Sequence, residues 1–226
     1  MKPTRNIAET RTPDGSRFSL HEHDGDYFLK LGGSQLMSSG WTLSEEKLAD
    51  AACHFSKCHE ALRILVGGLG LGFSLKRVLE LVGNKAEVCV AELLPEVVEW
   101  NREHLGDLNG ALLDDNRVSI FVGDVYDCIV QSGSLYYDAI LLDVDNGPEA
   151  FVQAENARLY DQHGLEMVYD SLREGGRAAF WSADPESSFL RQMRKAGFEA
   201  EEIKAKTHER AKRAANRIYV GERRAT

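Results

Sequence analysis

The chain has 226 residues, 43% of them hydrophobic and 28% charged, so it can bury a core, and its length fits one domain with at most a small appendage. Its formal net charge of −9 argues against nonspecific binding of nucleic acid across the whole surface. It has no apolar run that would serve as a signal peptide or cross a membrane, which predicts a soluble cytoplasmic protein without a membrane partner.

A first unit, residues 1–58, is predicted to contain short strands. Apolar and polar residues alternate over 18–22 and again over 27–31, with a polar turn between them, which predicts a β-hairpin. After two further glycines, residues 34–38 are expected to form a third short strand. The hairpin is expected to cover the crevice of the following unit as a lid or to pair with another subunit.

A leading helix is predicted to close this first unit. Ser44 offers a hydroxyl that can cap a helix, and Glu45 and Glu46 place acidic groups in the first turn, where the helix dipole favours them. Leu48, Ala51, Ala52 and Phe55 then repeat at helical spacing.

A second unit, residues 59–226, alternates strands with helices. Strands are expected at 64–66, 88–91, 118–122, 139–142, 178–181, 198–203 and 217–221. Helices are expected at 74–81, 95–104, 159–172 (stopped by Gly175 and Gly176) and 185–197. This alternation predicts a Rossmann-like, doubly wound, mostly parallel sheet with helices on both faces. The last two strands have no clear helix between them, which predicts the antiparallel closing strand of a seven-stranded methyltransferase-type sheet.

The cysteines favour reduced thiols over a metal site. Cys53 and Cys58 are spaced C-x4-C, while zinc sites usually show C-x2-C pairs with a second pair downstream. Cys89 and Cys128 each stand alone in an apolar run. No metal is therefore predicted.

The strongest local signal is the glycine-rich segment 67–72, directly after the first strand of the second unit and before a helix. Glycines there allow a sharp turn and a close approach of the backbone to a ligand. The segment lacks the Gly-Lys-Ser/Thr ending of a P-loop, which argues against an ATPase. Glu92 ends the next strand at the spacing expected for an acid that binds a ribose diol.

Two further acidic positions follow strands. Asp124 comes directly after the third strand, where a carboxylate can accept from the amine of an adenine, and Asp143 and Asp145 come after the fourth. Ligands in open α/β sheets bind outside the carboxyl ends of the strands, so these acids are expected to face one crevice. The pattern predicts a nucleoside pocket.

Several motifs together resemble the spermidine synthase (polyamine aminopropyltransferase) family. They are Leu-Lys-Leu-Gly-Gly-Ser-Gln at 29–35, Ser-Glu-Glu at 44–46 followed by His54, the glycine loop, Asp-Val-Asp-Asn-Gly-Pro at 143–148, Leu-Tyr at 159–160 and Leu-Arg-Glu-Gly-Gly at 172–176. The resemblance covers most of the chain. It implies an S-adenosyl-nucleotide fold and the transfer of an aminopropyl group from decarboxylated S-adenosylmethionine to a small-molecule amine.

The resemblance also implies roles for individual residues. Asp143 and Asp145 are expected to be catalytic, by accepting the proton of the attacking amine. The nucleoside is expected to contact Gly67, Gly68, Gly70, Gly72, Glu92, Leu93, Asp124, Val125 and Asp143. A homodimer is implied by the resemblance alone. Trp181, at the end of a strand, is a candidate pocket residue, whereas Trp100 is expected in the core.

Other functions stay open because the motifs depart from the family pattern. The glycine loop lacks the family's acid, and the loss of that charge is compatible with the carboxylate of S-adenosylmethionine. The same pocket would then serve a methyltransferase for a small acceptor. A non-catalytic binding module that keeps the fold is a further alternative, which the strand-end acids at 92, 124 and 143 argue against.

Overall fold

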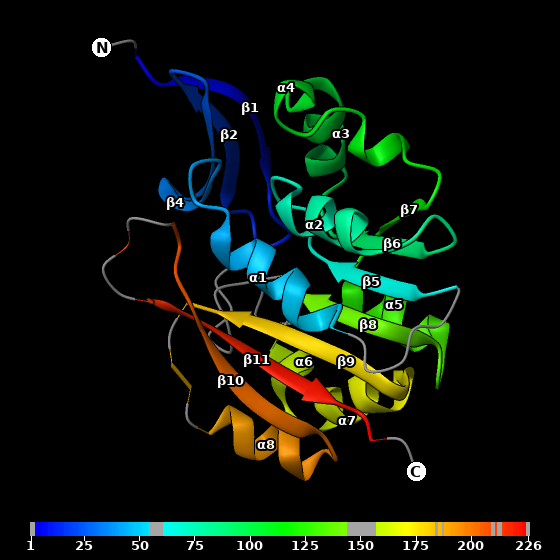
Figure 1. Ribbon diagram of the computed structural model, residues 1–226. Helices are drawn as coiled ribbons and strands as arrows, with labels where there is room; N and C mark the ends of the chain where they lie inside the picture. Colours follow the sequence, from blue (N-terminus) through cyan, green and yellow to red (C-terminus); the bar gives the residue numbers. More distant parts are fainter. Residues whose placement is uncertain are drawn as a thin grey trace.

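The computed structural model describes residues 3–54, 61–143, 157–183, 185–186, 188–208, 211 and 214–224. The predicted boundary between residues 58 and 59 lies outside these ranges, as does Asp145. The described chain forms a four-stranded sheet followed by a seven-stranded sheet with helices on both faces (Figure 1).

The N-terminal sheet is antiparallel, in the order β1-β2-β3-β4. Its strands are β1 (Arg5–Arg11), β2 (Arg17–His23), β3 (Asp26–Leu31) and β4 (Ser34–Ser38). The predicted hairpin is therefore correct, and its turn uses positive φ at Asp24 (52°) and Gly25 (90°), as tight hairpin turns require. The first strand was not predicted, because none of its residues is buried and it pairs only with β2.

The large sheet has the order β10-β11-β9-β8-β5-β6-β7. Its strands are β5 (Arg63–Gly67), β6 (Glu87–Glu92), β7 (Val118–Val122), β8 (Tyr137–Leu142), β9 (Leu172–Ser182), β10 (Glu199–Ala205) and β11 (Asn216–Glu222). The pairs from β7 through β9 are parallel, and β11 pairs antiparallel with both β9 and β10. The predicted methyltransferase-type sheet with its antiparallel closing strand is confirmed.

The helices lie in two layers. They are α1 (Leu43–Ala52), α2 (Phe73–Leu81), α3 (Pro95–Glu103), α4 (Gly106–Asn109), α5 (Val125–Ser132), α6 (Ala157–Tyr160), α7 (Gln162–Ser171) and α8 (Phe189–Lys195), with a 3-10 turn η1 (Leu112–Asp114). Side chains alternate along β5, so that Ile64 and Val66 join the core under α1–α3 and Leu65 joins the core under α5–α8. Both faces of the sheet are therefore buried, as a parallel sheet requires.

Helix α1 differs from its prediction at the first turn. It begins at Leu43 with Thr42 as the N-cap, and no side chain caps it. Ser44 was expected to be the capping hydroxyl, but it lies inside the helix, where its Oγ donates to Glu45 Oε2 at 2.6 Å. The expectation was wrong because the chain becomes helical two residues earlier, with Thr42 and not Ser44 at the N-cap, which leaves Ser44 and Glu45 in the buried first turn.

The segment predicted as one helix over 159–172 is broken. Asp161 ends α6 and caps α7, accepting a hydrogen bond from the Gly164 backbone N–H at 2.8 Å. The glycines at 175 and 176 do not stop this helix either, because β9 already begins at Leu172 and runs through them. A side chain at Gly176 would lie 2.8 Å from the Arg173 carbonyl oxygen, so Gly176 serves close backbone packing at the strand start.

Candidate functional site

The glycine loop lies between the end of β5 and the start of α2, as the sequence predicts. At Gly67 a Cβ atom would approach Leu142 to 2.8 Å, so a glycine is required for strand and helix packing beneath the loop. Gly70 has a φ of +51°, and a Cβ there would meet the Met37 sulfur at 2.6 Å. The N-terminal sheet thus packs directly on the loop through β4.

Glu92 is one of the buried acids of the site. It ends β6, is 8% exposed, and accepts hydrogen bonds from the backbone N–H groups of Leu69 and Leu94, both at 2.9 Å. Burial raises the pKa of its carboxyl above the ordinary value, and these amide hydrogen bonds offset part of that effect. Its carboxylate therefore ties the glycine loop to the turn after β6 and faces the pocket with neutral partners.

Asp124, directly after β7, accepts hydrogen bonds from two different elements. Its Oδ1 accepts from the Tyr126 backbone N–H at 2.8 Å and so caps α5, a helix that the sequence analysis did not identify. Its Oδ2 accepts from Arg158 Nη2 at 2.6 Å, and the Arg158 guanidinium lies 4.0 Å from the centre of the Tyr126 ring. Arg158 was missed because only the folded chain brings α6 to this strand end.

Asp143 follows β8 beside the glycine loop, and its backbone N–H donates to the Gly67 carbonyl oxygen at 3.0 Å. Its place at the end of a buried strand matches the prediction. Asp145, predicted to act with it, lies outside the described residues.

Glu92, Asp124 and Asp143 line one pocket, which has about 1010 Å³ of empty space, its open mouth included. Of the predicted nucleoside contacts, the pocket is lined by Gly68, Gly70, Glu92, Leu93, Asp124, Val125 and Asp143. Gly67 and Gly72 are not among its lining residues. Trp181 lines the pocket, whereas Trp100 is buried and stacks on Phe18 at 5.9 Å between ring centres.

The remaining walls were not predicted in detail. The N-terminal sheet contributes Phe18, Leu29, Leu36 and Met37, and α1 contributes Glu45. The hairpin is therefore a wall of the pocket within one chain, which agrees with the covering role expected for it. The sequence analysis took Glu45 as a helix-start signal and as part of the family-like Ser-Glu-Glu segment, but nothing local in the sequence shows that its side chain turns inward.

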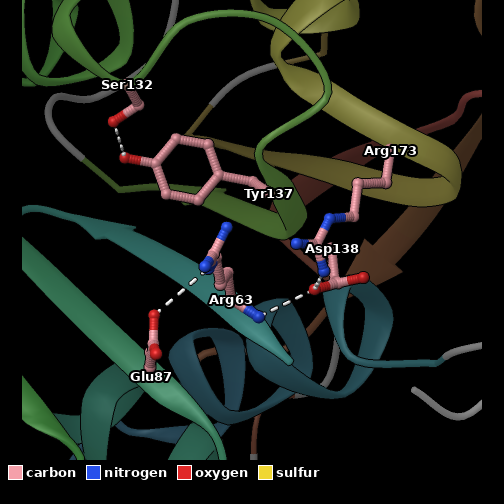
Figure 2. A network of polar contacts seen from close by, with 6 residues as sticks. All are labelled: Arg63, Glu87, Ser132, Tyr137, Asp138 and Arg173. Atoms are coloured by element: carbon pink, nitrogen blue, oxygen red, sulfur yellow. Dashed lines mark hydrogen bonds and ion pairs between the residues drawn. The ribbon is translucent and has the colours of Figure 1, made fainter. Parts of the chain in front are cut away.

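A second polar cluster lies at the other end of the parallel strands, where they start (Figure 2). Buried Asp138, near the start of β8, accepts from the Arg63 backbone N–H at 2.7 Å and pairs with Arg173 at 2.9 Å. The Arg63 side chain pairs with Glu87 at 3.1 Å, and Tyr137 bonds to Ser132 at 2.6 Å. These contacts join the starts of β5, β6, β8 and β9, so this cluster is structural.

Among the described residues, no group of three or more His, Cys, Asp or Glu side chains is arranged to hold a metal ion. Cys53, Cys89 and Cys128 are free thiols, and Cys58 lies outside the described ranges. None of the described helices is long and apolar enough to cross a membrane.

Sequence comparisons identify relatives, although no family model matches the chain. Polyamine aminopropyltransferase 2 of Pseudomonas aeruginosa is 33% identical over 160 residues, which are 68% of this chain and 42% of that protein. The polyamine aminopropyltransferase of Korarchaeum cryptofilum is 33% identical over 115 residues, 50% of this chain and 33% of that protein. The chain therefore spans less than half the length of these two relatives.

Structural comparisons support the fold. Spermidine synthase from Thermotoga maritima superposes with a TM-score of 0.76 at 18% identity, covering 98% of this chain and 73% of that one. A spermidine synthase in complex with the transition state analogue AdoDATO gives a TM-score of 0.75 at 18% identity, covering 96% and 72% of the two chains. These matches confirm the Rossmann-like sheet together with the N-terminal strands.

Proposed function

We propose that this chain, which is spermidine synthase-like in sequence and fold, is a transferase that moves an aminopropyl group from decarboxylated S-adenosylmethionine to a small amine. The observation that carries the proposal is the pocket itself. Glu92, Asp124 and Asp143 end three strands and line one cavity beside a glycine loop. This arrangement fits a nucleoside at one end and a reacting amine at the other.

Each lining residue would contact a different part of the nucleoside, according to its position in the pocket. Glu92 would accept hydrogen bonds from the ribose hydroxyls and Asp124 from the adenine amine, with Leu93 and Val125 beside the nucleoside. The backbone at Gly68 and Gly70 would allow the donor to approach the loop closely. Each oxygen of the Glu92 and Asp124 carboxylates keeps acceptor capacity beyond its present hydrogen bond.

The chemical step is a nucleophilic displacement. The amine nitrogen forms a bond to the aminopropyl carbon attached to the sulfonium, the carbon–sulfur bond breaks, and sulfur keeps the electron pair, releasing methylthioadenosine. The attacking amine must be neutral, so its extra proton has to leave. Asp143, with Asp145 assisting, would accept that proton and hold the nitrogen in line with the carbon.

The first test is a thermal-shift series with decarboxylated S-adenosylmethionine, methylthioadenosine, S-adenosylmethionine and S-adenosylhomocysteine. A ligand that binds only the folded state raises the melting temperature. We expect the first two compounds to stabilise the protein more than the last two. Preference for the carboxylated pair would favour methyl transfer instead, and no shift with any compound would contradict the nucleoside pocket.

Asp143→Asn tests the proposed base. The amide keeps the size of the side chain but cannot accept the proton, so turnover should fall by about 10²- to 10⁴-fold. Binding of methylthioadenosine should change little, since the ribose and adenine contacts remain. Steady-state kinetics and isothermal titration calorimetry measure the two effects, and retained turnover would contradict the assignment.

A further inference from the structure

Two cysteines that stand far apart in the sequence meet between strand β6 and helix α5. Cys89 lies on β6 and Cys128 on α5, and their sulfur atoms are 3.9 Å apart. Cys128 is 5% exposed, and Cys89 is half-buried against the same core. Neither thiol has a part in the proposed transfer reaction, so their meeting calls for a separate explanation.

The separation of the two sulfur atoms suits a disulfide bond. At 3.9 Å the sulfurs of Cys89 and Cys128 are direct neighbours, and no other atom fits between them. A disulfide bond brings its two sulfur atoms to about 2 Å, so an approach of about 2 Å remains. Small rotations of the two side chains and a slight shift of α5 are enough for such a movement.

The surroundings of Cys128 favour its ionised form. A hydrogen bond from the Cys89 thiol lowers the pKa of Cys128 to about 7, and the Tyr137 hydroxyl at 3.8 Å acts in the same direction, although burial opposes both. The Tyr137 hydroxyl is itself bonded to Ser132 at 2.6 Å. At Cys53, by contrast, burial raises the pKa to about 12. Because a thiolate is the form that attacks an oxidant, Cys128 is the more reactive thiol.

The thiol pair is close to the pocket along both of its elements. Cys89 comes three residues before Glu92 on β6, and Cys128 comes four residues after Asp124, which caps α5. Glu92, Asp124 and Val125 all line the pocket. A bond between the two sulfurs would therefore fasten the start of α5 to the strand that carries Glu92.

We propose that Cys89 and Cys128 form a site of reversible oxidation, at which hydrogen peroxide closes a disulfide bond between β6 and α5. The Cys128 thiolate attacks one peroxide oxygen, the O–O bond breaks, and a sulfenic acid forms while hydroxide leaves. The Cys89 sulfur then attacks the Cys128 sulfur, the S–O bond breaks, and a second hydroxide leaves. The hydroxides take up the two thiol protons, so two thiols are oxidised and the peroxide is reduced to two water molecules.

The test is peptide mapping of the folded wild-type protein after treatment with hydrogen peroxide. Trypsin cleaves after Lys and Arg, so residues 86–102 and 118–158 form separate peptides that each hold one cysteine of the pair. Without reductant we expect these peptides to be cross-linked, with a mass two hydrogen atoms below their sum, and dithiothreitol should separate them. No cross-link, or one that involves Cys53 or Cys58 instead, would overturn the inference.

A double variant is the matched control for the other cysteines. Cys53→Ser/Cys58→Ser keeps only Cys89 and Cys128 of the four cysteines in the chain. Hydrogen peroxide should remove both remaining thiols within single chains, and dithiothreitol should restore both, as counted with a thiol reagent. Cross-linking between chains, or thiols that survive the peroxide, would contradict a disulfide between β6 and α5.

Trapping with dimedone, which reacts with sulfenic acids, tests the order of the two steps. In Cys89→Ser the serine hydroxyl can still donate to Cys128, but no second thiol is present, so label should accumulate on residues 118–158. In Cys128→Ser the label on residues 86–102 should appear about tenfold more slowly or less, because the pKa of Cys89 is raised. Equal labelling of the two variants would overturn the assigned order.

These measurements do not depend on the proposed function. Peptide masses and thiol counts are taken without any ligand, and the wild-type mapping needs no variant that has to fold. A protein that binds no nucleoside contradicts the proposed function, whereas a protein that forms no cross-link between Cys89 and Cys128 overturns this inference alone.

Discussion

Buried acids lie near both ends of the parallel strands of the large sheet, and their hydrogen-bond and ion-pair partners differ. Where the strands start, Asp138 is 2% exposed and pairs with the Arg173 guanidinium at 2.9 Å (Figure 2). Where they end, Glu92 has only backbone N–H partners, and Glu45 has a serine hydroxyl. Among the described residues, neither Glu92 nor Glu45 forms an ion pair.

This difference separates structure from function. An acid that holds strands together carries its own cation, because an unpaired buried charge destabilises the fold. The pocket acids keep acceptor capacity for ligand hydroxyl, amine or ammonium groups at the expense of some stability. Asp124 is intermediate, since Arg158 already pairs with it at 2.6 Å.

The largest expected effect on stability is at Asp138, in the polar cluster where the strands start. Asp138→Ala removes the acceptor of the Arg63 amide and of Arg173, so the free energy of unfolding should fall by about 3 kcal/mol. Urea denaturation measures it. Glu87→Gln, which breaks a more exposed ion pair of the same cluster, should cost less than about 1 kcal/mol. Equal losses in the two variants would contradict the distinction.

The second effect is on the pocket side. Glu92→Gln keeps the size of the side chain but weakens its hydrogen bonds to ribose, so methylthioadenosine should bind about tenfold to a hundredfold less tightly. Its stability should fall less than that of Asp138→Ala, because only one of the two backbone N–H donors loses its acceptor and the buried charge is removed at the same time. Calorimetry measures the loss of methylthioadenosine binding, and denaturation of the same preparation measures the change in stability. Strong destabilisation without loss of binding would place Glu92 with the structural acids.

A third effect concerns the contact between the two sheets. Gly70→Ala forces a side chain into φ +51° against Met37, so stability should fall by about 1–2 kcal/mol. Gly83→Ala is the control, because nothing lies within 4 Å of a Cβ there and its φ is not in the left-handed region. Thermal melts of both variants measure the difference, and equal melting temperatures would contradict the packing argument.

The smallest effect is a pH dependence. The pKa of Glu45 is raised above 4.5 in the folded state, so the folded protein holds this proton more tightly than the unfolded chain. Its ionisation therefore lowers stability as pH rises from 4.5 through the folded pKa. Glu45→Gln removes that loss and should be more stable than wild type at pH 7 by less than about 1 kcal/mol. The gain should vanish below pH 4.5, and denaturation at both pH values measures it.

The sequence alone determined the sheet and three of its acids. Glu92, Asp124 and Asp143 follow buried strands, and parallel strands place their carboxyl ends at one edge, so local pattern and one topological rule predict their meeting. The glycine loop is similarly local, since turn geometry and close packing restrict it to small residues.

The tertiary structure alone decided the rest of the pocket. Met37 meets Gly70, Arg158 meets Asp124 and Glu45 turns into the cavity only because separate elements pack together. The polar strand β1 likewise forms by pairing with β2 and has no buried residue to mark it. Periodicity reports which face of an element is buried, but which neighbour covers that face depends on contacts between residues distant in the chain.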